Sequence, residues 1–592
     1  MLNFLRNHVR PYWRGIIAVS APLLLLPLPI TGVKEAQCGY TIMIMAIYWM
    51  TEALPLPVTS LIPVVALPLF GIMETGDVST AYMKDTNMMF IGGLILALAI
   101  QFCNLHKRVA LAVLLLVGAK PRWLLAGFMG TTAFLSMWIS NTATTAMMVP
   151  IVDAVAAELY KDDDEEMVRT ISHATITTNC GSIEELVPSD SNESRRTSAE
   201  AEKERKRKIR AGIMISTSYS SVIGGTGSLI GSSPQLALKG IVQEIFGQTE
   251  LNFASWIAFN VPGMLFNLFF TWVWLQVIFI GSGKQSKSDG GRDKEVIKVI
   301  RQKFKDLGPM TFHEAAVLIL FIICVLLWFF RDPGFIPGWA ELFGNAKNVD
   351  DATAVMLIVL LLFAIPSKPT FWCLRPKEAS SESVDVPPKS SPALLDWKYV
   401  QDRLPWGVIL LLGGGYALSD ATKKSGLSDW IGKQLAGMIV LPPFVIMLVV
   451  CIITAGVTEV ASNTAVANIF LPILADTATA IQINPLYFMV PVTVTCSYAF
   501  MLPVSTPPNA IAFAAAKMKP DEMMKAGWFI KLVCVVVICV TMETWGNVVF
   551  GSKHFPIWAN VTTSGLSQSV SRCADSSIPF TSPNSSDLIH RS

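Results

Sequence analysis

Long apolar runs alternate with short polar or basic segments along most of the chain. A helix that crosses a membrane needs roughly 20 predominantly apolar residues, so the pattern predicts an all-α polytopic membrane protein with about eleven transmembrane helices. A shorter apolar run at 109–117 is expected to lie along the membrane interface. The spans are expected at about 13–31, 40–56, 58–73, 86–105, 212–246, 255–281, 312–330, 352–367, 405–422, 485–517 and 526–549.

Two further apolar segments, at about 122–157 and 439–477, carry a small polar cluster near their middle. Each segment suits two half-depth helices, so we predict two re-entrant helical hairpins that enter and leave the membrane on one side. The clusters match: Ser-Asn-Thr-Ala stands at 140–143 and again at 462–465, each followed by Pro-Ile at the same spacing. A Gly-Gly pair upstream keeps that spacing too. The chain is therefore expected to consist of two halves built on one plan.

Charge sets the expected orientation, because Lys and Arg concentrate in cytoplasmic loops. Basic residues precede the first span, which places the N-terminus in the cytoplasm. The charged segments at 161–210, 282–311 and 368–403 are expected to be cytoplasmic as well. Counting spans then makes the hairpin at 122–157 open inward and the hairpin at 439–477 open outward. Inverted repeats of this kind are typical of secondary transporters.

This count puts the C-terminus outside the cell. The tail carries two glycosylation sequons, at Asn560 and Asn584, which only a lumenal or extracellular tail could use. The predicted division is 1–39 (N-terminus and first span), 40–281 (first inverted repeat), 282–311 (cytoplasmic loop), 312–550 (second inverted repeat) and 551–592 (extracellular glycosylated tail).

Composition supports the membrane assignment. The chain has 592 residues, of which 52% are hydrophobic and 15% charged, whereas a soluble domain has about 25% charged residues. The net charge of +2 gives no sign of nucleic-acid binding. The ten Cys and six His are scattered, so neither a disulfide framework nor a zinc site is indicated.

Each Ser-Asn-Thr cluster is followed by a second interruption inside a predicted span. In the second half it reads Ser-Thr-Pro-Pro-Asn at 505–509, and in the first half Gly-Ser-Ser-Pro-Gln at 231–235. Two consecutive Pro cannot continue a helix, because both lack an N–H and clash with the preceding turn. Backbone that is not hydrogen-bonded to itself is tolerated in a bilayer only where it lines a cavity or binds something.

These interruptions favour ion binding. Free carbonyls with Ser, Thr and Asn oxygens suit Na⁺, whereas N–H groups at the positive ends of half-helices suit an anion. No Arg or Lys is expected inside the broken elements, so co-bound cations would neutralise the anion. Burying either charge alone is costly, which gives a physical reason for coupling. An intramembrane enzyme is disfavoured because no nucleophile–base pair or metal set lies at membrane depth.

With paired Ser-Asn-Thr hairpins and a downstream Thr-Pro-Pro-Asn break, the chain resembles the divalent anion/sodium symporter family, in particular its dicarboxylate-transporting members. The resemblance covers essentially all of residues 12–550. It implies a homodimer with scaffold and transport domains, elevator-type alternating access, and a multi-pass protein of the plasma membrane, on the apical side of epithelial cells. It also implies electrogenic uptake of citric-acid-cycle dicarboxylates with about three Na⁺.

By matching position, the resemblance implies two Na⁺ sites and a substrate site between them. One Na⁺ site is Ser136, Ser140, Asn141 and the backbone of Gly231; the other is Thr458, Ala461, Asn463 and the backbone of Ser505. The substrate carboxylates would meet Asn141, Thr142, Ser232, Asn463, Thr464 and Thr506. The first break has Ser-Ser-Pro-Gln where the second has Thr-Pro-Pro-Asn, so the roles of Ser233 and Gln235 stay open.

Spacing alone leaves the substrate open, because fixed polar groups can bind other anions. A symporter of the same fold for sulfate or mainly for citrate is the first alternative. An anion channel, which would conduct without Na⁺, is the second. Glu459 is an intramembrane acid and a functional candidate by default, although it could equally pair within its own hairpin.

Overall fold

The computed structural model describes residues 12–117, 121–159, 190–247, 249–280, 289–331, 337–343, 349–368, 391–427, 430, 442–503 and 505–559. Several expectations fall outside these residues: parts of the expected cytoplasmic segments, at 161–189, 282–288 and 369–390, and the sequons at Asn560 and Asn584. The described residues are mainly helical, and one isolated β-bridge joins Pro366 and Ala393. The all-α class is confirmed for the described residues.

The first half is built from helices that match the apolar runs. They are α2 (Trp13–Leu25), α3 (Pro27–Ile30), α4 (Lys34–Thr51), α5 (Leu56–Thr59), α6 (Ile62–Leu69), α7 (Thr75–Thr80), η3 (Ala81–Met83), α8 (Asp85–Phe102), α9 (Leu105–Val117), α10 (Pro121–Ser136), α11 (Asn141–Leu159), α13 (Asp190–Gly225), α14 (Ser233–Phe246), α15 (Phe253–Leu275) and η4 (Gln276–Ile280).

The later part of the chain, 289–559, contains the remaining described helices. Its helices are α16 (Asp289–Asp306), α17 (Phe312–Phe329), η5 (Trp339–Phe343), α18 (Asp351–Ala364), α19 (Trp397–Arg403), α20 (Trp406–Ser425), α22 (Pro443–Val457), α23 (Asn463–Ala480), α24 (Pro485–Cys496), α25 (Pro507–Ala516), α26 (Pro520–Thr544), α27 (Gly546–Phe550) and η9 (Ile557–Ala559).

Several of these helices are long and apolar enough to cross a membrane unaided. Within the described residues they are Trp13–Ile30, Thr75–Phe102, Phe253–Ile280, Phe312–Phe329 and Pro520–Thr544, and the pair α19 and α20, bent by 63°, would add one more. The chain is therefore a multi-pass membrane protein. Most other apolar segments are short or interrupted, so the count of eleven spans stays a prediction.

Four of these segments are helix pairs separated by a few non-helical residues. The predicted hairpins coincide with α10 and α11 and with α22 and α23, whose interruptions lie at 137–140 and 458–462. The predicted broken spans coincide with α13 and α14 and with α24 and α25, interrupted at 226–232 and 497–506. Pro at the first turn of α14 and α25 marks where each second helix restarts.

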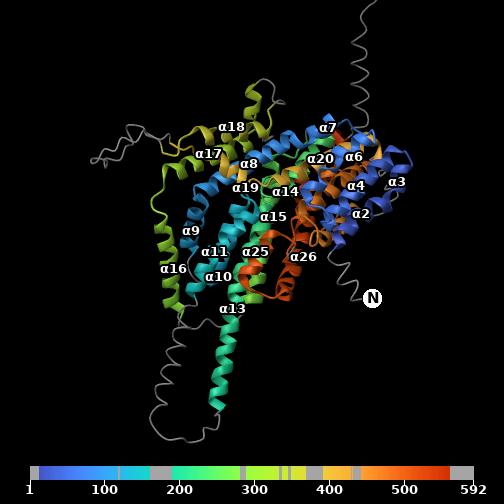
Figure 1. Ribbon diagram of the computed structural model, residues 1–592. Coiled ribbons are helices and arrows are strands. Elements are labelled where there is room, and N and C mark those ends of the chain that lie inside the picture. Colours follow the sequence, from blue (N-terminus) through green and yellow to red (C-terminus); the bar gives the residue numbers. More distant parts are fainter. Residues whose placement is uncertain are drawn as a thin grey trace, which may run out of the picture.

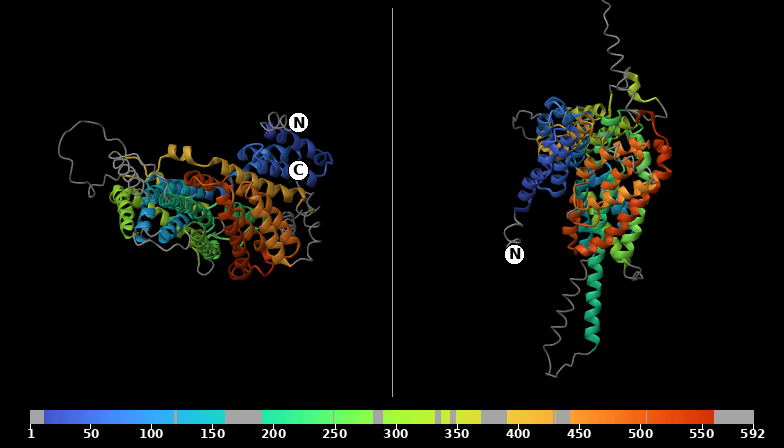
Figure 2. Two further views of the ribbon diagram at one scale, coloured as in Figure 1. Left: turned by 90° about the horizontal axis from the view of Figure 1, so that it is seen from below. Right: turned by 90° about the vertical axis from the view of Figure 1, so that its right-hand side faces the viewer.

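The broken helices gather in one part of the molecule (Figure 1). There α13 packs against α10, α11 and α25, and α14 packs against α23 and α24, so the two halves interlock. A second group contains the unbroken α8 with α17 and α18, and α20 with α4 to α6. The first part of α13 projects beyond the rest of the bundle, as both Figure 1 and the right-hand view of Figure 2 show.

Candidate functional site

The first hairpin is closed by a hydroxyl and an amide. The Oγ of Ser136, the last residue of α10, lies 2.8 Å from Oδ1 of Asn141, the first residue of α11. The same hydroxyl lies 2.7 Å from the carbonyl of Ser221 on α13. Its single proton can serve only one of these acceptors at a time. The interrupted hairpin thereby brings three oxygens together inside the helix bundle.

The second hairpin repeats this arrangement atom for atom. The Oγ1 of Thr458 lies 2.9 Å from Oδ1 of Asn463, the first residue of α23. It also lies 2.6 Å from the carbonyl of Cys496, the last residue of α24. In both halves a hydroxyl before the break therefore meets the Asn amide after it and a carbonyl from the neighbouring broken span. The matching tetrapeptides thus occupy equivalent positions.

The two downstream breaks are equivalent as well. Ser232 precedes α14 with φ −150° and ψ 147°, and Thr506 precedes α25 with φ −145° and ψ 149°. Three residues on, the amide of Gln235 lies 3.5 Å from the carbonyl of Gly225, and Asn509 donates to the carbonyl of Ala499 at 3.0 Å. Ser-Ser-Pro-Gln and Thr-Pro-Pro-Asn therefore build the same local structure despite their different residues.

Residues of the two halves meet at these breaks. The hydroxyls of Ser232 and Ser497 lie 3.3 Å apart. The hydroxyl of Ser218 on α13 donates to Oδ1 of Asn509 on α25 at 2.7 Å. Hydrogen bonds that cross between the two halves therefore hold the interrupted backbones against each other.

Glycine allows the close approach in the first half. A Cβ added to Gly225 would collide with Oδ1 of Asn141, so the end of α13 lies directly against the hairpin break. A Cβ on Gly231 would come within 2.5 Å of the carbonyl of Gly225. A side chain at Gly231 would therefore collide with backbone, and one at Gly225 would push the Asn141 amide out of place.

The remaining predicted residues differ in accessibility. Ser140 and Thr142 are exposed at the first break, whereas Ala461 and Thr464 are buried at the second. Ser505 stays within its own break, where its hydroxyl donates to the carbonyl of Leu502 at 2.7 Å. The buried Oγ1 of Thr506 has no hydrogen-bond partner among the described residues, so it is free to bind a ligand.

The chemistry of the site suits both a cation and an anion. The oxygens of the hairpin breaks are neutral amide, hydroxyl and carbonyl groups, which are hard ligands of the kind that Na⁺ accepts. Four helices, α11, α14, α23 and α25, begin directly after a break. Their N-termini carry free N–H groups and partial positive charge, which favour a bound carboxylate or sulfate.

One expectation about charge is wrong. We predicted no Arg or Lys inside the broken elements, but Lys239 lies in α14, which is the second half of a broken span. It is buried and forms an ion pair with Asp351, which Arg331 also contacts at 2.7 Å. Burial acts to raise the pKa of the neighbouring Asp350, but Lys239 and Arg331 outweigh it and hold that pKa below its usual value. These acids neutralise the charge of Lys239.

Glu459 pairs outside its own hairpin. Its carboxylate accepts hydrogen bonds from the backbone N–H groups of Phe500, Met501 and Leu502, at 3.0 to 3.2 Å. It also accepts one from Nζ of Lys531 on α26 at 2.6 Å. The acid therefore fixes the interrupted backbone of the second half. Lys531 is not among the predicted site residues. A lone Lys inside the apolar run at 526–549 nevertheless signals that the side chain has a buried partner.

Comparison with known proteins places the chain in a family. The family described as "Sodium:sulfate symporter transmembrane region" matches residues 11–552. The Na⁺/citrate cotransporter of Rattus norvegicus is 40% identical over 94% of this chain and 99% of its own length.

Two further relatives have similar coverage. The Na⁺/dicarboxylate cotransporter 3 of Rattus norvegicus is 41% identical over 92% of this chain and 94% of its own length. The Homo sapiens protein named solute carrier family 13 member 2 is 41% identical over 93% of this chain and 96% of its own length. The resemblance inferred from the motifs is confirmed. The chain belongs to the sodium:sulfate symporter family, and it is a multi-pass membrane transporter with Na⁺ as its coupled ion, not an enzyme.

Proposed function

We propose that this chain is an electrogenic symporter that imports di- and tricarboxylates with about three Na⁺ per substrate. The substrates would be citric-acid-cycle intermediates: succinate, fumarate, malate, 2-oxoglutarate and divalent citrate. The observation that carries the proposal is the repeated hydroxyl–amide pair, Ser136 with Asn141 and Thr458 with Asn463. The repeat supports the proposal because it gives each half the same neutral oxygens beside the N-terminus of a helix, α11 or α23.

Two Na⁺ sites flank the substrate in this mechanism. Ser136, Ser140, Asn141 and the Gly231 backbone hold one ion, and Thr458, Ala461, Asn463 and the Ser505 backbone hold the other. The substrate carboxylates contact Asn141, Thr142, Ser232, Asn463, Thr464 and Thr506. The buried hydroxyl of Thr506 supports this assignment, because it has no hydrogen-bond partner among the described residues. The N-termini of α14 and α25 support it as well, because helix N-termini favour a bound anion.

Coupling then follows from charge balance. The nearby cations Lys239 and Lys531 are already paired with Asp351 and Glu459, so neither is free to neutralise a dianion. Bound Na⁺ supplies that charge instead, and the substrate in turn stabilises the ions. An empty or fully loaded site is cheaper to move through the membrane than a half-loaded one.

For the transport cycle, we propose an elevator in which the broken helices move as one body against the rest. The division of the helices into two groups supports this, because the breaks at 137–140, 226–232, 458–462 and 497–506 all lie within α10–α15 and α22–α26. The same proposal includes inverted repeats at 40–281 and 312–550 and hairpins that open to opposite sides. It also includes eleven membrane spans and a homodimer in the lipid bilayer.

We further propose a plasma-membrane location, at the apical surface of epithelial cells. The N-terminus would be cytoplasmic, and the tail at 551–592 extracellular and glycosylated. The segments at 161–210, 282–311 and 368–403 would be cytoplasmic loops. The distribution of Lys and Arg supports this orientation.

A symporter of the same fold that prefers citrate is a second candidate, with the same support from the relatives as a dicarboxylate symporter. One relative with nearly full coverage is named a Na⁺/citrate cotransporter and another a Na⁺/dicarboxylate cotransporter, at 40% and 41% identity. These values do not separate the two substrates. A sulfate symporter, suggested by the family description, and an anion channel have less support.

Radiolabelled uptake in a cell line without endogenous transport tests these possibilities. Succinate, citrate and sulfate are compared in Na⁺ and in choline medium. The proposal predicts uptake of succinate and citrate only in Na⁺. Uptake of sulfate but not of succinate or citrate would indicate a sulfate symporter of the same fold. Conductance that persists in choline would indicate a channel.

A further inference from the structure

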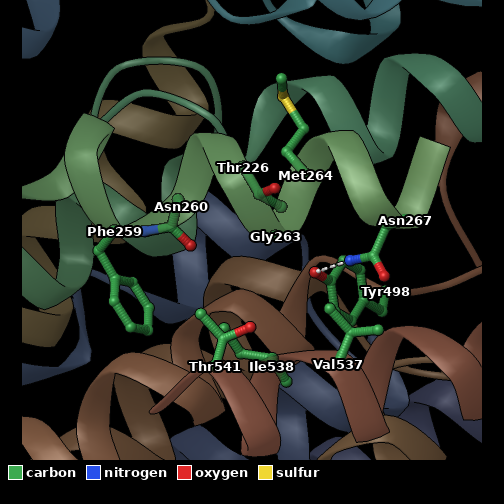
Figure 3. Close-up of a pocket in the computed structure, with 10 residues that line it drawn as sticks. All are labelled: Thr226, Phe259, Asn260, Gly263, Met264, Asn267, Tyr498, Val537, Ile538 and Thr541. Atoms are coloured by element: carbon green, nitrogen blue, oxygen red, sulfur yellow. Dashed lines mark hydrogen bonds between the residues drawn. The ribbon is translucent and has the colours of Figure 1, made fainter. Parts of the chain in front are cut away.

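A small buried cavity lies between α15 and α26, behind both of the downstream breaks (Figure 3). Its volume is about 10 Å³, which is roughly the space for the centre of one water molecule or one dehydrated ion. Five of its lining residues carry polar side chains: Thr226, Asn260, Asn267, Tyr498 and Thr541. So many polar groups inside an otherwise apolar helix pair require an explanation, because burying them without partners is costly.

Asn267 lines this cavity and carries an unpaired acceptor. The residue is only 1% exposed, and its Oδ1 has no hydrogen-bond partner among the described residues. Its amide nitrogen donates to the hydroxyl of Tyr498 at 3.0 Å, as Figure 3 shows. That bond uses the amide nitrogen, so the oxygen is the part of this side chain left without a partner. Asn260 lies two turns earlier on the same face of α15, with Gly263 between them.

Two of the other side-chain donors are already used within the bundle. The amide of Asn260 donates to the carbonyl of Trp256 at 3.4 Å. The hydroxyl of Thr226 donates to the carbonyl of Ile223 at 2.7 Å. The oxygens of these side chains keep free lone pairs, and hydroxyl groups can rotate to present theirs. The side-chain oxygens of Asn267, Asn260 and Thr226 can therefore act as acceptors in the cavity, a set that suits a cation.

Two helices end at this cavity. Thr226 follows directly after Gly225, the last residue of α13, and Tyr498 comes two residues after Cys496, the last residue of α24. Helix C-termini carry partial negative charge, so both dipoles favour a positive ion here. None of the described residues that line the cavity is acidic. A neutral ligand set suits a monovalent ion rather than Mg²⁺ or Ca²⁺, which favour carboxylates.

We propose that this cavity is a third Na⁺ site, distinct from the two hairpin sites. This inference rests on the proposed function, Na⁺-coupled symport, and adds to it by assigning a site to a third coupled ion. The site touches the breaks at 226–232 and 497–506 from behind, through Thr226 and Tyr498. An ion bound here therefore stabilises the same interrupted backbone that presents Ser232 and Thr506 to the substrate.

The decisive variant fills the cavity without removing a hydrogen bond. A Cβ on Gly263 would have Thr541 Oγ1 as its nearest neighbour, at 3.7 Å, which is an ordinary contact. Gly263→Ala should therefore fold normally and exclude the ion. Gly39→Ala in α4 is the matched control, because its Cβ meets no described atom within 4 Å. Asn267→Ala, which removes the proposed ligand oxygen, is the second variant.

The first measurement is Na⁺ activation of succinate uptake, with the charge carried per succinate recorded under voltage clamp. Gly263→Ala and Asn267→Ala should reach the cell surface and show a lower Hill coefficient. They should also carry about one elementary charge fewer per succinate, because one bound ion is lost. Gly39→Ala should match the wild type. A wild-type Hill coefficient and charge ratio in both cavity variants would mean that the cavity holds only water, and would overturn the proposal.

The second measurement does not depend on the substrate. Purified wild type and Gly263→Ala are heated in NaCl or choline chloride, since ions that bind the folded state raise its melting temperature. The variant should need several-fold more Na⁺ for half-maximal stabilisation, and identical titrations would reject the site. If the wild type transports no carboxylate, the proposed function fails, while this titration still decides whether the cavity binds Na⁺.

Discussion

The hydroxyl of Thr458 lies 2.9 Å from Oδ1 of Asn463, across the break of the second hairpin. Ser136 stands in the same relation to Asn141, at 2.8 Å, across the break of the first. In each pair the hydroxyl belongs to the residue five positions before the Asn. A separation of five does not place residues on one face of a continuous helix. The contact exists only because the helix is interrupted, so it ties the break to the position of the amide.

Asn141→Ala and Asn463→Ala should each abolish Na⁺-driven carboxylate uptake while the protein still reaches the cell surface. Each change removes an amide proposed to contact both a cation and the substrate. We expect uptake below about a tenth of the wild type, since one charge-assisted contact is worth about 1.5–3 kcal/mol. Uptake is measured with surface biotinylation, and Asn547→Ala in α27 is the control. Normal uptake by either variant would remove that residue from the site.

Two substitutions at Thr458 separate the role of its hydroxyl group from the role of its branched side-chain shape. Thr458→Val keeps the branched side chain but loses the hydrogen bonds, whereas Thr458→Ser keeps the hydroxyl. A bond of about 1 kcal/mol corresponds to about a fivefold change in affinity, so the Val variant should need about five times more Na⁺ for half-maximal uptake. The Ser variant should stay near the wild type. Thr479→Val is the control, because that hydroxyl only bonds the carbonyl of Ala475 in its own helix.

The ion pair of Glu459 and Lys531 should matter for folding. Their side chains are 8% and 10% exposed, so removing one partner leaves a buried, unpaired charge. Glu459→Gln and Lys531→Met should each destabilise the protein by about 3–5 kcal/mol, and the double variant should recover part of that loss. Thermal unfolding of purified protein measures this.

The exposed pair Lys553 and Glu543, 3.5 Å apart, provides the control. Lys553→Met should cost less than about 1 kcal/mol, because exposed ion pairs contribute little. If Glu459→Gln is as stable as the wild type but does not transport, the carboxylate acts in transport rather than in holding the break at 497–506.

Local signals predicted much of this site. Ser-Asn-Thr clusters and consecutive Pro mark helix ends through their own chemistry, so the helix breaks at 137–140, 226–232, 458–462 and 497–506 appear where the sequence placed them. Long-range contacts had no such signal. Lys531 is 72 residues from Glu459, and Tyr498 is 231 residues from Asn267, so only packing reveals these pairs. The buried partner of Lys239 is likewise 112 residues away, at Asp351, so its pairing is visible only in the fold.

Electrical and pH measurements test the charge balance of the proposed cycle. About three Na⁺ with one dianion carry net positive charge inward, so succinate should evoke an inward current. Acidifying the medium should not raise succinate uptake, because it removes dianion. Citrate uptake should rise instead, because protonation converts the trivalent anion to the divalent form. Electroneutral succinate uptake would contradict the stoichiometry, and a flat citrate response would contradict the preference for divalent anions.

The tail offers a test of orientation. Asn560 and Asn584 lie in sequons that only an extracellular tail could use. Glycosidase treatment should therefore increase the mobility of the wild-type band on a gel, and replacing both residues by Gln should abolish the shift. An unshifted wild-type band would argue against an extracellular, glycosylated tail.

Gly225 allows a test of the geometry that does not alter any polar group. The residue ends α13 directly against Asn141, and an added Cβ would collide with Oδ1 of that amide. Gly225→Ala should therefore displace Asn141 and abolish Na⁺-driven uptake. Ala stabilises helices relative to Gly by about 1 kcal/mol, so lost helix propensity cannot explain such a defect.

Gly130→Ala in α10 is the matched control for this change. It places the same methyl group in the same hairpin, at a position where the Cβ meets no described atom within 4 Å. Uptake should stay at the wild-type level, with equal surface expression in both variants. Equal uptake by Gly225→Ala and Gly130→Ala would show that transport tolerates movement of the Asn141 amide. The first hairpin break would then be a structural kink rather than part of an ion-binding site.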